Sequence, residues 1–322
     1  MKAIQVDGQE LRWNEVVEPP LGVGEVRIAN RATALNRADL AQRAGHYAPP
    51  PGASLILGLE CAGVVEAIGE GVGRVREGDH VCALLAGGGY AEKVVVPAGQ
   101  VLPIPEGLSF HEAAALPEVF ATAYLNLFME AYLEPGEFVL LHAGASGVGT
   151  AAIQLCAAFD NPCFVTAGNT EKVERCVELG AAAGCDRHVD HFVEEVPRWT
   201  SQHGMDVILD PVGGAYFESN IASLAVDGRL VLIGLLDGSA APVALGAMMS
   251  RRLRVIGSTL RGRSIAAKSR VMDALHDRVW PLIEAGKVRA VVETVMPVTD
   301  ANQAHQLLSE NGTFGKVVLD IP

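Results

Sequence analysis

The sequence predicts an α/β protein in which a β-rich domain precedes a doubly wound parallel sheet. Three observations support this fold class. The chain has 322 residues, more than one hydrophobic core of ordinary size can organise. Its first 120 residues or so alternate apolar and polar side chains with a period of two, between turns rich in Gly and Pro. Beyond them, short apolar runs alternate with helical patterns, as in a parallel sheet with helices on both faces.

The expected strands of the first part include residues 25–29, 63–69 and 90–97. Their alternation and regular turn signals indicate an all-β, barrel-like domain. The pattern changes near residue 110, where we expect an Ala- and Leu-rich helix over residues 111–131. Ser109 stands three residues before Glu112, which is the spacing of a capping box at the start of that helix.

The second part reads as alternating strands and helices. A helix follows the glycines at 144–149, and another over residues 170–179 ends before Gly180. Solidly apolar strands between such helices predict a parallel sheet that is covered on both faces. The expected strands are residues 138–142, 163–167, 205–212 and 228–234.

The last sixty residues give a long helix from about residue 264, a strand near 294, a helix after Thr299 and a strand over 315–319. Periodicity leaves open whether this tail extends the parallel sheet or returns to the first domain.

Composition excludes several classes of protein. A hydrophobic content of 49% excludes disorder, and no apolar run reaches the roughly 18 residues of a membrane-spanning helix. The formal net charge of −13 argues against general binding to nucleic acid or anionic membranes. The first residues lack the apolar core of a signal peptide, so we expect a cytoplasmic protein. The six cysteines lack metal-site spacing, so we expect buried thiols rather than disulfides.

The strongest chemical signal lies between the strand expected at 138–142 and the helix after it. Glycines at 144, 147 and 149 have the spacing GxxGxG. Such glycines let the backbone approach a pyrophosphate, and the helix N-terminus adds unpaired N–H groups and a positive dipole end. We therefore predict a dinucleotide site at Gly144, Ser146, Gly147, Val148 and Gly149.

The tip of the next strand distinguishes NADP(H) from NAD(H). An NAD site usually places Asp or Glu there to hold the ribose hydroxyls, whereas residues 166–170 read TAGNT. Lys172 stands in the first helical turn, where a cation is unfavourable unless an anion lies beside it. We therefore predict NADP(H), with Gly168, Asn169 and Lys172 near the 2′-phosphate.

Several segments resemble the medium-chain dehydrogenase/reductase superfamily. Residues 58–65 read GLECAGVV, close to its signature GHExxGxV with Leu59 in place of His, and residues 142–150 read HAGASGVGT. The segments NRADL at 36–40, YAPPPGAS at 47–54 and GKVVL at 315–319 extend the resemblance over essentially the whole chain. Within the superfamily the chain resembles the zinc-free quinone oxidoreductases, most closely the tumour-suppressor-inducible members.

The resemblance implies a GroES-like catalytic domain over residues 1–120, a Rossmann NADP-binding domain over 121–262, and a return to the catalytic domain over 263–322. It also implies a homodimer or homotetramer in which the strand at 229–234 pairs with its copy. Further cofactor contacts follow from it, at Thr122, Arg187, Gly234, Leu235, Leu236, Leu260, Gly315 and Lys316.

The same resemblance argues against zinc. Zinc-dependent relatives have Cys where this chain has Asn36 and His where it has Leu59, and neither replacement is a zinc ligand. No cysteine falls within residues 85–105, where the structural-zinc lobe is expected. We therefore expect no metal.

Without a metal to polarise a carbonyl, the expected reaction is hydride transfer from NADPH to an electron-poor acceptor. A quinone, or the β-carbon of an enone or enal, meets this description, and the sequence does not separate the two. The resemblance places Tyr47 in the substrate pocket, as a proton donor or a positioning group, and Asn36 beside the substrate or the nicotinamide. Tyr47 and Asn36 are therefore the predicted catalytic residues.

A third hypothesis is an NADPH-binding structural or RNA-binding protein, because some zinc-free relatives act in that way. Residues 248–270 carry seven basic residues and no acidic one. They contain no aromatic side chain on which a base could stack, so we expect a small-molecule substrate rather than nucleic acid.

Overall fold

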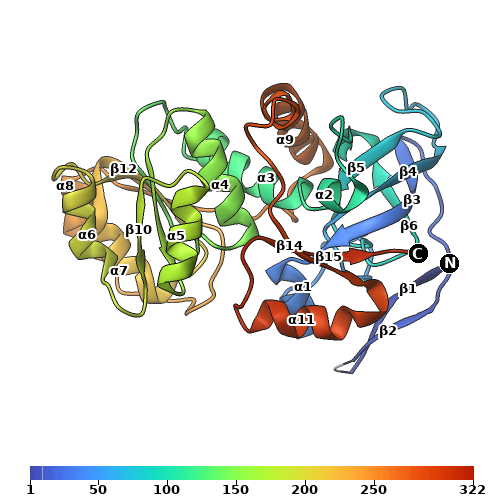
Figure 1. The fold of residues 1–322 in the computed structure, drawn as a ribbon, viewed down its shortest axis with the longest axis horizontal. Helices are drawn as coiled ribbons and strands as arrows, with labels where there is room; N and C mark the ends of the chain where they lie inside the picture. The colour runs from blue at the N-terminus through green and yellow to red at the C-terminus, as the bar shows by residue number, and fades with distance from the viewer. Residues whose placement is uncertain (9) are drawn as a thin grey trace. The chain divides into compact units, whose positions relative to one another are not determined.

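The computed structural model describes residues 1–8 and 10–322, and the chain divides into two compact units (Figure 1). Unit 1 comprises Met1–Ala121 and Leu260–Pro322, and unit 2 comprises Thr122–Thr259. The first unit is therefore built from both ends of the chain.

The strands of unit 1 form a seven-stranded sheet in the order β14-β15-β3-β4-β5-β7, with β6 also paired to β3. The last strand, β15, pairs antiparallel with β3 and parallel with β14, so the tail joins the sheet of the first domain (Figure 1). A separate hairpin pairs β1 with β2. The strands are β1 (Lys2–Asp7), β2 (Glu10–Glu15), β3 (Glu25–Ala34), β4 (Glu60–Ile68), β5 (His80–Leu84), β6 (Lys93–Pro97), β7 (Val101–Pro103), β14 (Val292–Pro297) and β15 (Lys316–Asp320).

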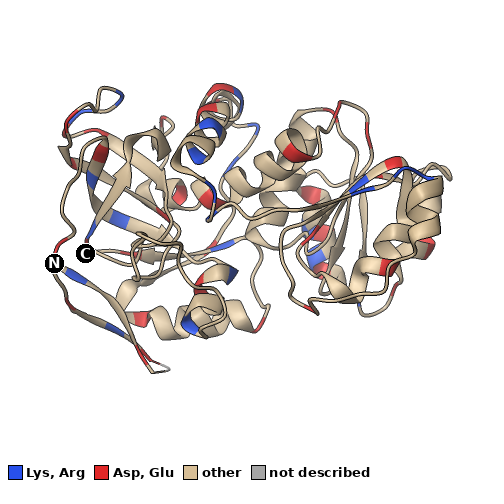
Figure 2. Ribbon diagram, turned by 180° about the vertical axis from the view of Figure 1, so that it is seen from behind, with Lys and Arg blue, Asp and Glu red and all other residues tan. Residues whose placement is uncertain are grey.

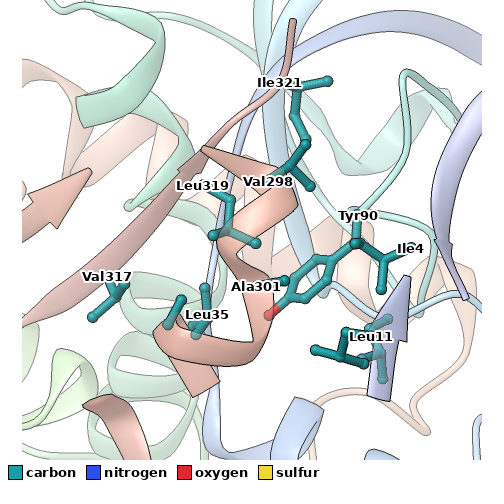
Figure 3. Close-up of a cluster of buried hydrophobic side chains, with 11 residues drawn as sticks. Ile4, Leu11, Leu35, Tyr90, Val298, Ala301, Val317, Leu319 and Ile321 are labelled. Carbon is teal, nitrogen blue, oxygen red and sulfur yellow. The ribbon is translucent and has the colours of Figure 1, made fainter. Parts of the chain in front are cut away.

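One hydrophobic cluster of unit 1 joins the two ends of the chain. Figure 3 shows Ile4 and Leu11 of the hairpin in the same cluster as Leu319 and Ile321 of the tail. Tyr90 is fully buried among them, and its hydroxyl lies 3.2 Å from Nε2 of His305. Burial of apolar surface thus holds the tail against the first strands. The helices of this unit are α1 (Arg37–Arg43), α2 (Phe110–Ala114), α9 (Ile265–Arg278), α10 (Trp280–Glu284) and α11 (Ala301–Ser309).

Unit 2 is a six-stranded parallel sheet with the order β10-β9-β8-β11-β12-β13. This is the Rossmann order, and its topological switch point lies between β8 and β11. Figure 1 shows α4 and α5 on one side of the sheet and α6, α7 and α8 on the other. The strands are β8 (Val139–Leu141), β9 (Cys163–Ala167), β10 (Ala183–Asp186), β11 (Met205–Asp210), β12 (Leu224–Leu232) and β13 (Arg254–Gly257), and the helices are α4 (Gly147–Ala158), α5 (Thr170–Glu178), α6 (Phe192–Trp199), α7 (Gly214–Ser223) and α8 (Leu245–Ser250).

The single helix expected over residues 111–131 is wrong, because the segment is broken into three pieces. They are α2, α3 (Pro117–Tyr124) and a π-helix over Leu125–Glu130. Proline disfavours the helical conformation at the residue before it and cannot donate a hydrogen bond, so the chain restarts at Pro117. The capping box is confirmed: Ser109 N donates to Glu112 Oε2 at 2.9 Å, and Glu112 N donates to Ser109 Oγ at 3.3 Å.

The expectation that the strand at 229–234 pairs with its copy is also wrong. Those residues belong mainly to β12, which lies between β11 and β13 and pairs with both. Among the described residues, β13 is the strand at this edge of the sheet. Its four residues include one arginine and one glycine, a pattern too short and too mixed to read as a strand.

The basic run at residues 248–270 does not form one continuous surface. Arg251 donates to main-chain carbonyls at the end of α7, Arg252 pairs with an aspartate, and Arg261 and Lys268 are buried. Figure 2 shows Lys and Arg interspersed with Asp and Glu along α9. Four of the seven basic side chains are therefore buried or have partners within the protein, and they do not form a surface for a nucleic acid.

Two further expectations concern the chain as a whole. All six cysteines are free and buried, as expected of thiols that pack like small hydrophobes. In residues 1–8 and 10–322, no helix has the length and apolar character needed to cross a bilayer.

Candidate active site and nucleotide site

The glycine-rich turn lies at the end of β8 and leads into α4, at the switch point of the parallel sheet. Ser146 caps α4, because its Oγ accepts a 3.0 Å hydrogen bond from Gly149 N. A Cβ at Gly149 would lie 2.5 Å from the main-chain oxygens of Ala143 and Gly144, and one at Gly144 would lie 2.8 Å from Val165. Side chains are excluded at both positions, so the turn presents a bare backbone next to a helix N-terminus.

The tip of β9 carries the residues predicted to recognise a 2′-phosphate. Asn169 caps α5 and accepts from Lys172 N at 2.8 Å, and the Lys172 side chain is largely buried. Arg187 follows β10, and its main-chain N donates to Ala167 O at 3.0 Å. The structure therefore brings Arg187 to the tip formed by Gly168 and Asn169.

A cavity of about 190 Å³ opens beside this tip, within unit 2. Arg187 lines it together with the aromatic rings of Phe192 and Tyr216, whose centroids are 5.3 Å apart. The two rings are tilted by 49° and pack against each other, and Asp190 lines the cavity as well, so the group that suits a phosphate here is the guanidinium of Arg187. The bare turn, the cations and this cavity therefore fit a dinucleotide.

Sequence reasoning missed a buried polar chain beneath this site. His142 Nε2 lies 2.7 Å from Asn220 Oδ1, and Nδ1 lies 3.0 Å from Thr166 Oγ1. Asn220 Nδ2 donates to Asp210 Oδ2 at 2.9 Å, so Asn220 Oδ1 is an acceptor and the His142 proton belongs on Nε2. Burial lowers the pKa of His142 to about 4 and raises that of Asp210 to about 6. The histidine is thus neutral and holds the end of β8 in place.

In unit 1 the structure brings Asn36 and Lys316 together. Lys316 Nζ donates to Asn36 Oδ1 at 2.7 Å and to the main-chain oxygen of Leu35 at 2.5 Å, and it forms a 2.7 Å ion pair with Glu60 Oε1. Asn36 Nδ2 donates to the same carboxylate oxygen at 2.9 Å. Both ends of the Asn36 amide are therefore engaged, and the ammonium group that was expected at the cofactor points into the protein.

Asp39 supports the same corner of unit 1. It is fully buried, and its carboxylate accepts from Asn36 N at 2.8 Å and from Gly58 N at 2.9 Å. Burial raises its pKa to about 6, against the opposing effect of these hydrogen bonds. Asp39 thus fixes the main chain at the start of α1 where the Asn36 side chain emerges.

Tyr47 lies beside a buried arginine. The Arg261 guanidinium is 5.3 Å from the centre of the Tyr47 ring, which is a cation–π distance. Only 3% of Arg261 is exposed. The Arg261 guanidinium donates hydrogen bonds to Ala86 O at 2.8 Å and to Gln42 Oε1 at 2.7 Å. No carboxylate lies within ion-pair distance of Arg261 among the contacts of the described residues. Partial burial and the charge of Glu118 raise the pKa of Tyr47, and Arg261 opposes them.

Glu118 is the acidic residue whose charge raises the pKa of Tyr47. It stands in the first turn of α3, and its main-chain N donates to Glu60 Oε2 at 2.8 Å. Its own Oε2 is buried and has no hydrogen-bond partner in the described part of the chain. Burial, and next the charge of Glu60, raise the pKa of Glu118 to about 8.

The remaining predicted residues divide between the two units. Leu260 and Gly315 belong to unit 1, and Gly315 has a positive φ with space for no side chain beside Val291. Thr122, Gly234, Leu235 and Leu236 belong to unit 2, and the two leucines are more than half exposed. Each unit thus carries its own part of the predicted site.

The sequence analysis did not assign Glu60, Glu118, Arg261 or Lys268 to the site. Each stands near apolar or small residues in the sequence, and a charged residue there signals a buried partner. The fold decides which residue that partner is. A charged residue among apolar neighbours could therefore have marked these positions as buried, but it could not have identified their partners.

The amide of Asn36, which stands where zinc-dependent relatives have Cys, already bonds Lys316 and Glu60. In the described part of the chain, no three His, Cys, Asp or Glu side chains are grouped to hold a metal ion.

Comparison with known families agrees with the two units. Residues 22–106 match the alcohol dehydrogenase GroES-like domain, and residues 147–277 match the zinc-binding dehydrogenase family. The mouse synaptic vesicle membrane protein VAT-1 homolog is 32% identical over 327 residues, which covers 97% of this chain and 80% of the mouse protein. The chain belongs to the medium-chain dehydrogenase/reductase superfamily. It is an oxidoreductase by this membership, and Asn36 and Leu59 set it apart from the zinc-dependent pattern.

Solved structures of this superfamily resemble the whole chain. An NAD-dependent alcohol dehydrogenase is 33% identical, with a TM-score of 0.88 and 100% of both chains covered. The Escherichia coli quinone oxidoreductase complexed with NADPH is 27% identical, with a TM-score of 0.88 and 99% of both chains covered. The CurK enoyl reductase is 28% identical, with a TM-score of 0.88, 100% of this chain and 99% of that chain covered.

Proposed function

We propose that this oxidoreductase transfers hydride from NADPH to quinones without a metal. The observation that carries the proposal is the tip of β9, where residues 166–170 include no acid, Asn169 caps α5 and Arg187 bonds to Ala167 O through its main-chain N. Together with Lys172, these residues would suit a 2′-phosphate. A ribose with two free hydroxyls would instead call for an acidic residue there. The similarity to a quinone oxidoreductase that binds NADPH supports the same cofactor and acceptor.

The bound cofactor would supply the hydride, and the chain would supply its placement. The bare turn at Gly144–Gly149 and the N-terminus of α4 suit the pyrophosphate. Tyr47 and the cation of Arg261 suit an acceptor whose oxygen becomes negative as hydride arrives. A quinone needs no metal for this step, because it is already electron-poor.

Reduction of an enone or enal is the second candidate. It is favoured by a partly buried phenol, Tyr47, because the enolate formed by hydride addition must gain a proton before it can revert. The similarity to an enoyl reductase points the same way. The RNA-binding alternative has less support, since the basic run is divided between ion pairs and buried positions.

We also propose that the protein works in the cytoplasm as a homodimer or homotetramer. Among the residues that the structure describes, β13 is one of the two edge strands of the parallel sheet, and such an edge can pair with a second copy.

The test is to follow NADPH absorbance against a panel of ortho-quinones, para-quinones and enals, with NADH in parallel. Faster turnover of quinones with NADPH is expected. Turnover of simple alcohols with NAD⁺, without quinone reduction, would contradict the proposal. Salt-dependent RNA retention on filters without NADPH oxidation would favour the structural alternative.

A further inference from the structure

Unit 1 contains two buried cations, Arg261 and Lys268, for which the described residues provide no ion pair with a carboxylate. Arg261 and Lys268 are both buried, with 3% and 5% of each residue exposed. The hydrogen bonds of Arg261 go to neutral oxygens, and Lys268 Nζ donates to Arg261 O at 3.3 Å. Buried cations normally pair with carboxylates, so the ionisation of the acids around Arg261 and Lys268 decides the charge of this cluster.

Glu118 is the acid whose charge acts on all three of Arg261, Lys268 and Tyr47, and Asp39 acts on Arg261 as well, more strongly than Glu118 does. Its buried Oε2 has no hydrogen-bond partner among residues 1–8 and 10–322, an arrangement that is costly for a carboxylate and cheaper for a neutral carboxyl. Glu60 reinforces the neutral form, because its carboxylate accepts from the main-chain N of Glu118 itself at 2.8 Å.

Other groups that face Glu118 act in both directions. Asp39 of α1 disfavours its ionisation, whereas Lys316 of β15 and Arg261 favour it. The first turn of α3 also favours a carboxylate, through the positive end of the helix dipole. Burial is the largest influence, however, and the pKa of Glu118 comes to about 8. The carboxyl is therefore neutral near pH 7.

We propose that Glu118 is a positioning residue that acts in its neutral form, leaving the charge of Arg261 available to Tyr47 and to the oxyanion created by hydride transfer. This inference rests on the proposed function. An ionised Glu118 would offset Arg261 and hold the phenol proton more tightly, whereas a neutral one leaves a net positive field around the acceptor oxygen.

The chemistry balances without any further reactant. Bound NADPH would supply two electrons and a proton as hydride, to the β-carbon of an enone or to a quinone oxygen, and the acceptor would become an enolate or a hydroquinone monoanion. The Tyr47 O–H then gives its proton to the negative oxygen of that anion, and the phenolate is reprotonated by water. Glu118 neither gains nor loses a proton in this cycle.

The experiment compares pH profiles of turnover with an enone for the wild type, Glu118→Gln and the exposed control Glu106→Gln. The wild type and the control should lose about tenfold between about pH 7 and pH 9.5, as expected of one charge acting across a partly buried site. Glu118→Gln, a neutral mimic, should keep near wild-type turnover at neutral pH and stay within about threefold across the range. An unchanged alkaline decline in Glu118→Gln, or a loss of turnover at neutral pH in a folded protein that binds NADPH, would overturn the inference.

A second measurement does not depend on activity. Carboxyl-carbon NMR of wild-type protein labelled at glutamate should show one resonance titrating near pH 8, and it should vanish in Glu118→Gln. Tyrosinate absorbance, corrected with Tyr47→Phe, should show a lower pKa for Tyr47 in Glu118→Gln than in the wild type. Titration of every glutamate at ordinary acidic pH, or an unchanged Tyr47, overturns the inference. Failure of the proposed function would appear separately, as no NADPH oxidation with any acceptor.

Discussion

Lys316 donates a 2.7 Å hydrogen bond from Nζ to Asn36 Oδ1, joining residues that lie 280 positions apart in the chain. The resemblance had assigned Lys316 to the cofactor and Asn36 to the substrate or the nicotinamide. In the structure the same ammonium group also pairs with Glu60, and 3% of Lys316 is exposed. The lysine therefore places a cation inside the catalytic unit and fixes the orientation of the Asn36 amide.

Removal of this cation should destabilise the protein strongly. Lys316→Met leaves the fully buried Glu60 without its counter-ion, and breaking a buried pair in this way typically costs about 3–5 kcal/mol. Urea unfolding measures the loss, and Lys287→Met on the surface is the control. The double variant Glu60→Gln with Lys316→Met should recover part of the stability. A cost no larger than that of the control would show that the pair contributes little.

Lys172→Ala should weaken NADPH binding and leave NADH binding almost unchanged. A charge-assisted hydrogen bond to a phosphate is typically worth about 1.5–3 kcal/mol, and NADH lacks the phosphate. Titration calorimetry with both nucleotides measures the difference, with Lys287→Ala as the control. Equal weakening for both nucleotides would place Lys172 away from the 2′-phosphate.

Tyr47→Phe should slow enone reduction more than quinone reduction. A general acid contributes about 10²–10⁴-fold to a rate, and an enolate needs the proton at once, whereas a hydroquinone anion is stable until water protonates it. Steady-state kcat with one acceptor of each class is the measurement. If both substrates respond alike, Tyr47 only positions the acceptor and solvent supplies the proton.

Purified protein should contain no stoichiometric zinc, and chelators should leave turnover intact. Asn36 and Leu59 offer no ligand of the kind that zinc prefers, and the Asn36 amide is already held by Lys316 and Glu60. Elemental analysis beside an activity assay tests this. One zinc per chain that rises and falls with activity would overturn the zinc-free assignment.

The buried histidines should lose their contribution to stability as the pH is lowered from about 6.5 toward 4, whereas Asp39 and Asp210, whose pKa values burial raises to about 6, act in the opposite direction. Burial lowers the pKa of His142 to about 4 and that of His305 to about 3. A base whose folded-state pKa is depressed contributes stability above its unfolded pKa of about 6.5, and this contribution is lost as the pH falls through the folded value. As the pH is lowered, the thermal midpoint of His142→Gln should therefore fall less than that of the wild type. The exposed control His276→Gln should follow the wild type. Parallel declines for all three proteins would contradict a neutral, buried His142.

The geometry of the glycine turn was largely predictable from local sequence. Gly144, Ser146 and Gly149 act through a strand, a turn and a helix that are consecutive in the chain, so their spacing already describes the geometry. The cavity lined by Arg187, Phe192 and Tyr216 was predicted only in part, because its rings come from two helices on the far side of the sheet.

The sequence by itself determined the fold class, the glycine turn and the absence of an acid at the tip of β9, because periodicity and turn chemistry are local properties. Tertiary structure alone decided that β13 rather than β12 forms the sheet edge, and that Lys316 reaches Asn36 and Glu60. The last of these depends on the antiparallel pairing of β15 with β3. That pairing is selected by the burial of side chains from both ends of the chain, and no local pattern encodes which distant charge a buried charge will meet.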